Sequence, residues 1–226
     1  MSQKKYITRS RALRDEVRRL FGSGFLCEYS RLRVCISSDR DGSVRVTTDA
    51  QRSLRNITSG YKRLNAGVGV ERWGLGQEDS AILDLNADCG GRQASVDAQR
   101  VRPQKIEQDA KICVPPNAVV KVQYTIREFK RSNDAFYFTF FNPTIDPIIE
   151  VVIPESFEHT VELVSKGPPK SKKYPMYWLH EYEGTFLAYH YIMIRWWPKP
   201  IGSTVGQPVH GGSPIDRRNC KSMDLI

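Results

Sequence analysis

The sequence lacks an apolar run of about 18 residues, the length needed to cross a lipid bilayer. Its longest apolar runs, at 136–141 and 186–197, are interrupted by polar residues. It also lacks an apolar signal segment, because residues 1–5 lead directly into a strongly charged stretch. We therefore expect a protein with no membrane span, located in the cytoplasm.

Cysteine is sparse, and its spacing gives no sign of a disulfide framework or a zinc site. No pair is spaced as C-x-x-C, and the number of cysteines is odd: Cys27, Cys35, Cys89, Cys113 and Cys220. Four of them lie in or near apolar stretches, where a free thiol packs as a small hydrophobic side chain. This usage is typical of a reducing compartment.

Recognisable nucleotide-binding and catalytic motifs are missing as well. Gly67–Gly69 and Gly74–Gly76 resemble a phosphate-binding loop only superficially, since neither continues to a third glycine or opens a helix. No serine or cysteine lies in a nucleophile-elbow or papain-like context. We expect turn glycines here, no cofactor, and no catalytic residue that the sequence alone can identify.

Histidine is also scarce, with four residues: His159, His180, His190 and His210. His180 and His190 fall on two expected neighbouring strands and could face each other, with Glu181 or Glu183 as a further zinc ligand. Both histidines nevertheless lie among aromatic residues, where an imidazole usually packs and forms hydrogen bonds. We expect no metal site.

What the sequence does contain is β-strand patterning. Apolar and polar residues alternate over Arg31–Ile36 and Val44–Thr47, on either side of an Asp-Gly turn at 39–42, which predicts a hairpin. The segment Ile36–Val46 is similar to the first hairpin of many immunoglobulin-like accessory modules, and 116–122 is similar to a turn-then-strand in the same modules. This resemblance implies a sandwich and no activity.

Further strands are expected along the rest of the chain, with Ala118–Arg127 as the clearest. One of its faces carries Val120, Val122, Tyr124 and Ile126. Turn signals separate about ten short strands, which is typical of an antiparallel sandwich or barrel. We read 61–80 as a loop or irregular strand and 167–173 as a basic loop. The other expected strands are 81–85, 94–98, 111–114, 136–141, 148–153, 160–164, 174–180 and 185–197.

The predicted fold is therefore mainly β, an antiparallel sandwich of immunoglobulin-like or jelly-roll-like type, with a barrel as the alternative. Residues 1–22 are expected to form a basic amphipathic helix, because apolar residues recur at helical spacing between Leu13 and Phe21. Residues 23–197 form the β-rich domain, either as one unit or as two subdomains, 23–114 and 115–197. The Gly/Pro/Ser-rich segment 198–226 is expected to be a flexible tail.

The formal net charge of +9 favours an anionic partner. The helix could cover the sheet, contact nucleic acid or lie on a membrane surface, in that order of preference. Nucleic-acid binding would use its polar face and the basic loop at 170–173. The candidate contacts are Lys4, Lys5, Arg9, Arg11, Arg14, Arg18, Arg19, Lys170, Lys172 and Lys173.

Aromatic residues are concentrated in the C-terminal third of the chain. Because successive strand residues face opposite sides, consecutive aromatics must place at least one ring on an outer face. We identify a candidate partner surface comprising Trp178, Tyr182, Tyr191, Trp196 and Trp197. Stacking on a base or planar ligand, or packing against another protein, would suit such rings.

These features favour a non-enzymatic binding or sensing module that takes a protein partner or associates with itself. An accessory role in a bacterial regulatory or defence system is one setting for such a module. Two alternatives stay open. The first is a nucleic-acid-binding protein. The second is an enzyme of unrecognised type, whose site is built from residues distant in the sequence.

Overall fold

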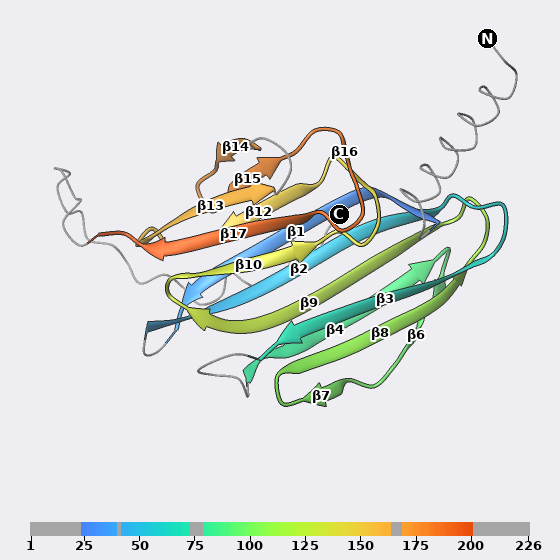
Figure 1. The fold of residues 1–226 in the computed structure, drawn as a ribbon, viewed down its shortest axis with the longest axis horizontal. Coiled ribbons are helices and arrows are strands. Elements are labelled where there is room, and N and C mark those ends of the chain that lie inside the picture. Colours follow the sequence, from blue (N-terminus) through green and yellow to red (C-terminus); the bar gives the residue numbers. More distant parts are fainter. Residues whose placement is uncertain (1–23, 40–41, 73–78, 164–168, 201–226) are drawn as a thin grey trace, which may run out of the picture.

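The computed structural model describes residues 24–39, 42–72, 79–163 and 169–200. The expected N-terminal helix and residues 201–226 of the expected tail lie outside these ranges. Within the ranges the chain forms β-strands and no α-helix, which confirms a mainly β fold (Figure 1). A helix of the length and apolarity needed to span a membrane is not found among the described residues.

A large mixed sheet forms the centre of the fold. The predicted hairpin is confirmed, and its strands β1 (Phe25–Ser38) and β2 (Ser43–Asn56) are longer than the sequence suggested. In sheet order the strands are β14 (Lys170–Lys173), β15 (Trp178–Glu181), β12 (Ile148–Val152), β1, β2, β9 (Val119–Arg131), β4 (Ala81–Cys89) and β5 (Arg92–Gln93). Two short strands extend this sheet beside β1, namely β11 (Thr144–Ile145) and β16 (Thr185–Phe186).

Two smaller sheets complete the fold. One has the order β10 (Asp134–Thr139), β17 (Tyr191–Pro198), β13 (Phe157–Leu163). The other has the order β3 (Lys62–Glu71), β8 (Lys105–Val114), β6 (Ser95–Val96), with β7 (Arg100–Arg102) also paired to β8. Figure 1 shows the first running along the β12–β1 part of the large sheet and the second along its β9–β4 part. The sheets thus pack in layers. The immunoglobulin-like or jelly-roll-like subtype stays a prediction.

The predicted antiparallel arrangement is wrong at one place. Strand β1 pairs in parallel with β11 and with β12, in the register Arg31–Ile148 to Cys35–Val152. Alternation of apolar and polar residues carries no information on strand direction, which is why the sequence could not show this. Within the described residues, the first and last strands of each sheet do not pair with each other. The closed barrel that was the alternative prediction is therefore not observed there.

The glycine-rich stretch expected to be a loop or irregular strand contains the regular strand β3. Leu64, Val68 and Val70 point inward and are buried. A Cβ atom at Gly67 would lie 2.8 Å from Asp109 Oδ1, and one at Gly69 would lie 2.9 Å from the Lys105 side chain. The two glycines therefore leave room for the Asp109 and Lys105 side chains of the neighbouring strand β8. Because they occupy outward positions where polar side chains would normally alternate with the buried residues, the strand pattern is hard to recognise in the sequence.

The basic loop expected at 167–173 is also partly a strand, because Lys170–Lys173 forms β14 at the edge of the large sheet. Lysines on an edge strand discourage pairing with the edge of another molecule. In all, seventeen strands are formed by the described residues, against about ten expected. Several of the additional strands, such as β5 and β6, are only two residues long and carry little pattern.

One hydrophobic core lies between the layers. The predicted inward face of β9 is confirmed, with Val120, Val122 and Ile126 buried and Tyr124 packed against them. Cys27 and Cys35 are buried free thiols, as expected for small hydrophobic residues. Cys113 is exposed instead, because its position on β8 faces outward.

Candidate binding surface

Strand β10 divides its aromatic residues between two faces. Phe136 and Phe138 point inward and are buried, whereas the Tyr137 side chain between them is 58% exposed. This confirms the expectation that consecutive aromatics leave at least one ring on the outer face. The ring of Tyr137 contacts that of Tyr191 on β17, with 6.0 Å between centroids.

Strand β17 divides its two tryptophans in the same way. Trp196 is fully buried, and its indole N–H donates a hydrogen bond to the Arg131 carbonyl at 3.1 Å. Trp197 is half-buried on the opposite face, and its indole N–H donates to Glu158 Oε2 at 2.9 Å. The assignment of Trp196 to the partner surface was therefore wrong, because its ring is part of the core.

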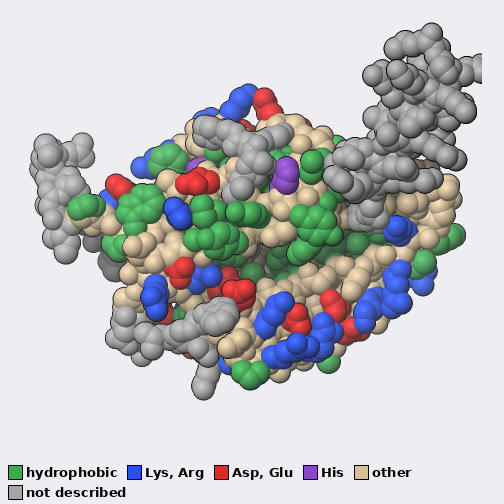
Figure 2. Space-filling view, viewed as in Figure 1, with side chains coloured by type: hydrophobic (Ala, Val, Ile, Leu, Met, Phe, Trp, Pro, Cys, Tyr) green, Lys and Arg blue, Asp and Glu red, His purple; other side chains and the backbone are tan. Residues whose placement is uncertain are grey.

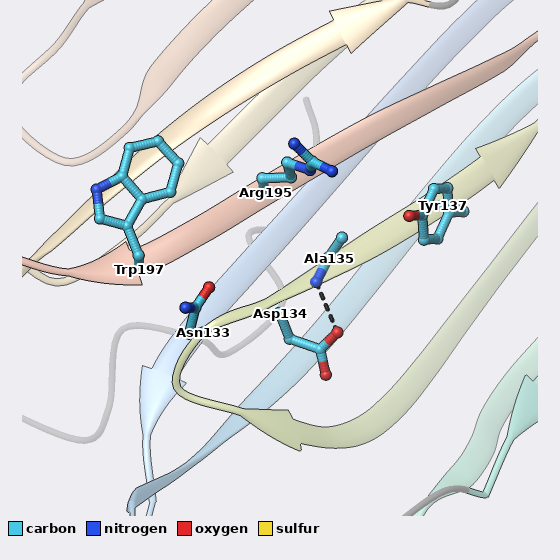
Figure 3. A pocket seen from close by; sticks show the side chains of 6 residues that line it. All are labelled: Asn133, Asp134, Ala135, Tyr137, Arg195 and Trp197. Carbon is cyan, nitrogen blue, oxygen red and sulfur yellow. Dashed lines mark hydrogen bonds between the residues drawn. The ribbon is translucent and has the colours of Figure 1, made fainter.

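An open depression of about 360 Å³ lies on the outer side of this sheet, at the turn between β9 and β10 (Figure 3). Its shape is fixed in part by Asp134, whose Oδ1 accepts a hydrogen bond from the Ala135 N–H at 2.7 Å. The depression offers aromatic rings, an arginine, a carboxylate and an amide. The lining residues are Asn133, Asp134, Ala135, Tyr137, Arg195 and Trp197.

Two more exposed rings lie just after the end of β10 and just before the start of β17. Phe141 is 57% and Tyr189 75% exposed, and their rings meet edge to face with 6.4 Å between centroids. Tyr189 has a φ of 68°, which is unfavourable for a residue with a side chain. Its N–H donates to the Phe140 carbonyl at 2.5 Å, and this contact helps to hold the strained backbone in place.

We call the outward side of this small sheet and its strand ends the aromatic face, comprising Tyr137, Phe141, Tyr189, Tyr191, Arg195 and Trp197. Figure 2 shows hydrophobic side chains gathered in a row across this part of the molecule. Clusters of exposed rings usually mark an interaction site, whereas single exposed apolar residues do not. The partner surface predicted from the sequence shares Tyr191 and Trp197 with this face and does not include the other four residues. The alternation of inward and outward positions along 136–141 is the sequence signal that indicates Tyr137 and Phe141 as outward residues.

The remaining predicted surface residues lie elsewhere. Tyr182 is buried, with its ring edge to face against Phe186, and is wrong as a surface residue. Burial and the Glu162 carboxylate raise the pKa of Tyr182 to about 12, so its hydroxyl stays protonated. Trp178 is half-buried and packs against His159 and His180.

These two histidines form a second distinct cluster, between β13 and β15. Their Nε2 atoms are 3.3 Å apart, and Ser171 Oγ lies 2.9 Å from His180 Nδ1. Burial, and then the neighbouring His159, lower the pKa of His180 to about 4; burial also lowers the pKa of His159. Both rings are therefore neutral at pH 7. A serine beside a base with such a low pKa is poorly activated for catalysis.

The zinc alternative placed His180 and His190 on neighbouring strands, but β15 does not pair with β17, and His180 contacts His159. In the part of the chain that the structure describes, no group of three or more His, Cys, Asp or Glu residues could hold a metal ion.

The three lysines of β14 each contact a nearby side chain. Lys170 pairs with Glu183, and the ammonium groups of Lys172 and Lys173 lie over the rings of Tyr174 and Trp178, at 4.9 and 5.6 Å from the ring centroids. The seven basic residues expected on the helix face fall outside the described residues: Lys4, Lys5, Arg9, Arg11, Arg14, Arg18 and Arg19.

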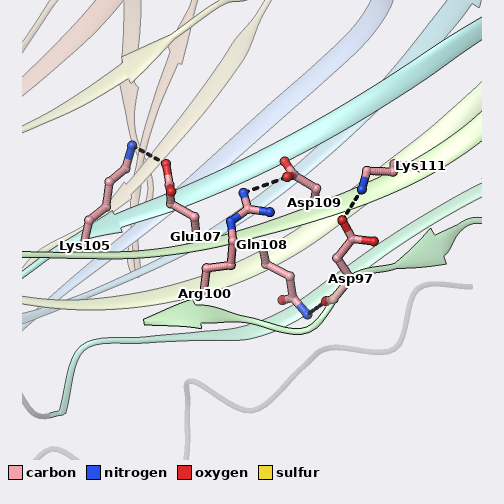
Figure 4. Close-up of polar contacts among 7 residues, drawn as sticks. All are labelled: Asp97, Arg100, Lys105, Glu107, Gln108, Asp109 and Lys111. Carbon is pink, nitrogen blue, oxygen red and sulfur yellow. Dashed lines mark hydrogen bonds and ion pairs between the residues drawn. The ribbon is translucent and has the colours of Figure 1, made fainter. Parts of the chain in front are cut away.

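Six charged residues on the outer side of the β3–β8–β6 sheet also form three pairs (Figure 4). Lys105 pairs with Glu107 at 2.8 Å, and Arg100 pairs with Asp109 at 2.8 Å. Lys111 contacts Asp97. This surface therefore has mixed charge, unlike the one-signed patch typical of phosphate-backbone binding. Nucleic-acid binding stays a prediction.

The sequence matches no protein-family model and no curated protein. Solved structures show remote similarity. A candidate nutrient-binding protein of Legionella pneumophila is 6% identical with a TM-score of 0.44, covering 77% of this chain and 68% of that one. A candidate protease of Parabacteroides distasonis is 10% identical with a TM-score of 0.46, covering 76% and 40%.

An M1 zinc metallopeptidase of Deinococcus radiodurans is similarly remote, with 9% identity, a TM-score of 0.43, and coverage of 76% of this chain and 42% of that one. The chain spans well under half the length of the two peptidase structures. At this identity and TM-score, these similarities carry no argument about function.

Proposed function

We propose that the protein is a non-enzymatic, cytoplasmic binding module, built as a β-sandwich, that recognises a protein partner through the aromatic face. The observation that carries this proposal is the exposure of Tyr137, Phe141 and Tyr189, each more than half exposed, on one side of a three-stranded sheet. Tyrosine, tryptophan and arginine are the residues that most often dominate the binding energy of protein interfaces.

The composition of the face supports a protein partner. Rings alone would favour non-specific association, but the depression also presents Arg195, Asp134 and Asn133 beside Tyr137 and Trp197. Such polar groups fix the orientation of a partner, because each must find a hydrogen bond when water leaves the interface.

The face is also largely organised in advance of binding. Tyr137 rests on Tyr191, and the Trp197 indole is held by Glu158. Tyrosine and tryptophan have few rotatable bonds, so immobilising their rings costs little conformational entropy. A partner would therefore meet a surface that needs only modest ordering.

A paired substitution, Tyr137→Ala with Trp197→Ala, tests the proposal. We expect partner retention to fall at least tenfold, since residues that dominate an interface contribute about 2 kcal/mol or more each. Tagged protein expressed in its source cells, followed by quantitative mass spectrometry of the retained proteins, gives the readout.

The matched control is Tyr61→Ala with Val101→Ala. These residues are 72% and 63% exposed and lie outside the aromatic face. The control should retain the partner, and both paired variants should unfold within a few degrees of wild type. Equal retention by wild type and the Tyr137/Trp197 variant would contradict the proposal.

A further inference from the structure

His159 and His180 bring two imidazole nitrogens together from different sheets. His159 lies on β13 of the small sheet, and His180 lies on β15 of the large sheet. We infer that these two histidines form a chelating site for a late first-row divalent metal ion, which would link the two sheets. This site is independent of the aromatic face and of the partner proposed for it.

The separation of the two nitrogens fits this role. In a tetrahedral site with metal–nitrogen distances of about 2.0–2.1 Å, two ligand atoms lie about 3.3–3.4 Å apart. The two Nε2 atoms are 3.3 Å apart. In the metal-free protein one ring donates its Nε2–H to the other. An ion would displace that proton but lie to one side of the line between the two nitrogens, so each ring would turn by roughly 35° while the strands stay in place.

The surroundings orient His180 as a ligand. Its Nδ1 lies 2.9 Å from Ser171 Oγ, and a hydroxyl that accepts the Nδ1–H leaves the Nε2 lone pair directed at His159. Histidine ligands commonly have their other ring nitrogen held in this way. The Trp178 ring stacks on His180 with 15° between the planes and packs edge to face on His159, which limits rotation of both rings.

The donor set determines which ions fit. Two imidazoles suit Cu²⁺, Ni²⁺ and Zn²⁺, whereas Mg²⁺ and Ca²⁺ prefer oxygen ligands. No third His, Cys, Asp or Glu joins the pair among the described residues, so water would complete the coordination. The Lys173 ammonium, 5.6 Å from the centroid of the Trp178 ring, adds a nearby positive charge that weakens binding. We therefore expect reversible binding, with Cu²⁺ stronger than Ni²⁺ and Ni²⁺ stronger than Co²⁺.

Thermal unfolding with added Ni²⁺ tests the inference. At a free ion concentration about a hundred times the dissociation constant, the midpoint of the full-length protein should rise by roughly 5–10 °C. The same concentration of Mg²⁺ should leave it unchanged. Cys113→Ser with Cys89→Ser provides the background, because these thiols are not fully buried and could bind the ion.

In that background His159→Gln and His180→Gln should each abolish the Ni²⁺ shift, whereas His190→Gln should keep it. No shift in the background protein, or a shift that survives both substitutions, would overturn the site. If a glutamine variant fails to fold, the Cu²⁺ complex of the background protein decides. Its electron paramagnetic resonance spectrum should show coupling to two imidazole nitrogens, and coupling to none or one would overturn the site.

Discussion

Replacing Trp196 by alanine is expected to lower the free energy of unfolding by about 4 kcal/mol, because truncating a buried tryptophan typically costs 3–5 kcal/mol. Trp196 is fully buried and is among the largest side chains in the core. The change also leaves the Arg131 carbonyl without the indole N–H that it accepts at 3.1 Å. Denaturant unfolding at pH 7 measures the difference.

Trp197→Ala is the matched control, since the same chemical change is made one residue along the strand. Trp197 is half-buried on the outer face, and its hydrogen bond reaches the exposed Glu158. We expect a loss of about 1 kcal/mol, which is near the average for single substitutions. Equal losses in the two variants would show that the two faces of β17 have been assigned incorrectly.

Acid is expected to destabilise the protein through the histidine pair. The pKa of His180 is about 4 in the native state because of burial and the nearby His159, and the ordinary value is 6.5. Between pH 6.5 and 4 the unfolded chain therefore binds a proton that the native protein does not. The free energy of unfolding therefore decreases as the pH is lowered across this window, by up to about 3 kcal/mol for His180. His159 acts in the same direction.

Denaturant unfolding between pH 7 and pH 4, in buffer containing a metal chelator, isolates this effect. His180→Gln cannot titrate, so its stability should depend less on pH than that of wild type. Carboxylates contribute to acid unfolding in both proteins, and this contribution cancels in the difference between them. Parallel pH profiles for wild type and His180→Gln would contradict the assigned burial of the histidine pair.

The strands with strong local alternation were predictable from the sequence. The β1–β2 hairpin and the inward face of β9 follow from apolar residues at every second position and from a tight turn. The mainly β class follows from the same signals. The sequence of β3 predicts a loop or irregular strand, because Gly67 and Gly69 stand where outward side chains would have completed the alternation.

The rest depends on pairing between distant segments. Arg31 and Glu150 form an ion pair at 2.6 Å although they are 119 residues apart, and no local pattern indicates that β1 and β12 run in parallel. Alternation along β17 requires Trp196 and Trp197 to lie on opposite faces, but it does not indicate which face is buried. That depends on the layer that packs beneath β17. The contact between His159 and His180 could not be predicted either, because their strands belong to different sheets and no local pattern shows how these sheets pack.

Site-specific photo-crosslinking tests the aromatic face most directly. A benzoylphenylalanine placed at Tyr137 in living cells should give a discrete crosslinked adduct with a single partner protein. The same group at Tyr61, which is 72% exposed and lies outside the aromatic face, should give none. Adding Arg195→Glu and Trp197→Ala should remove the adduct formed at position 137. The absence of an adduct at 137, or the same adduct at both positions, would contradict the assignment of the aromatic face as the recognition surface.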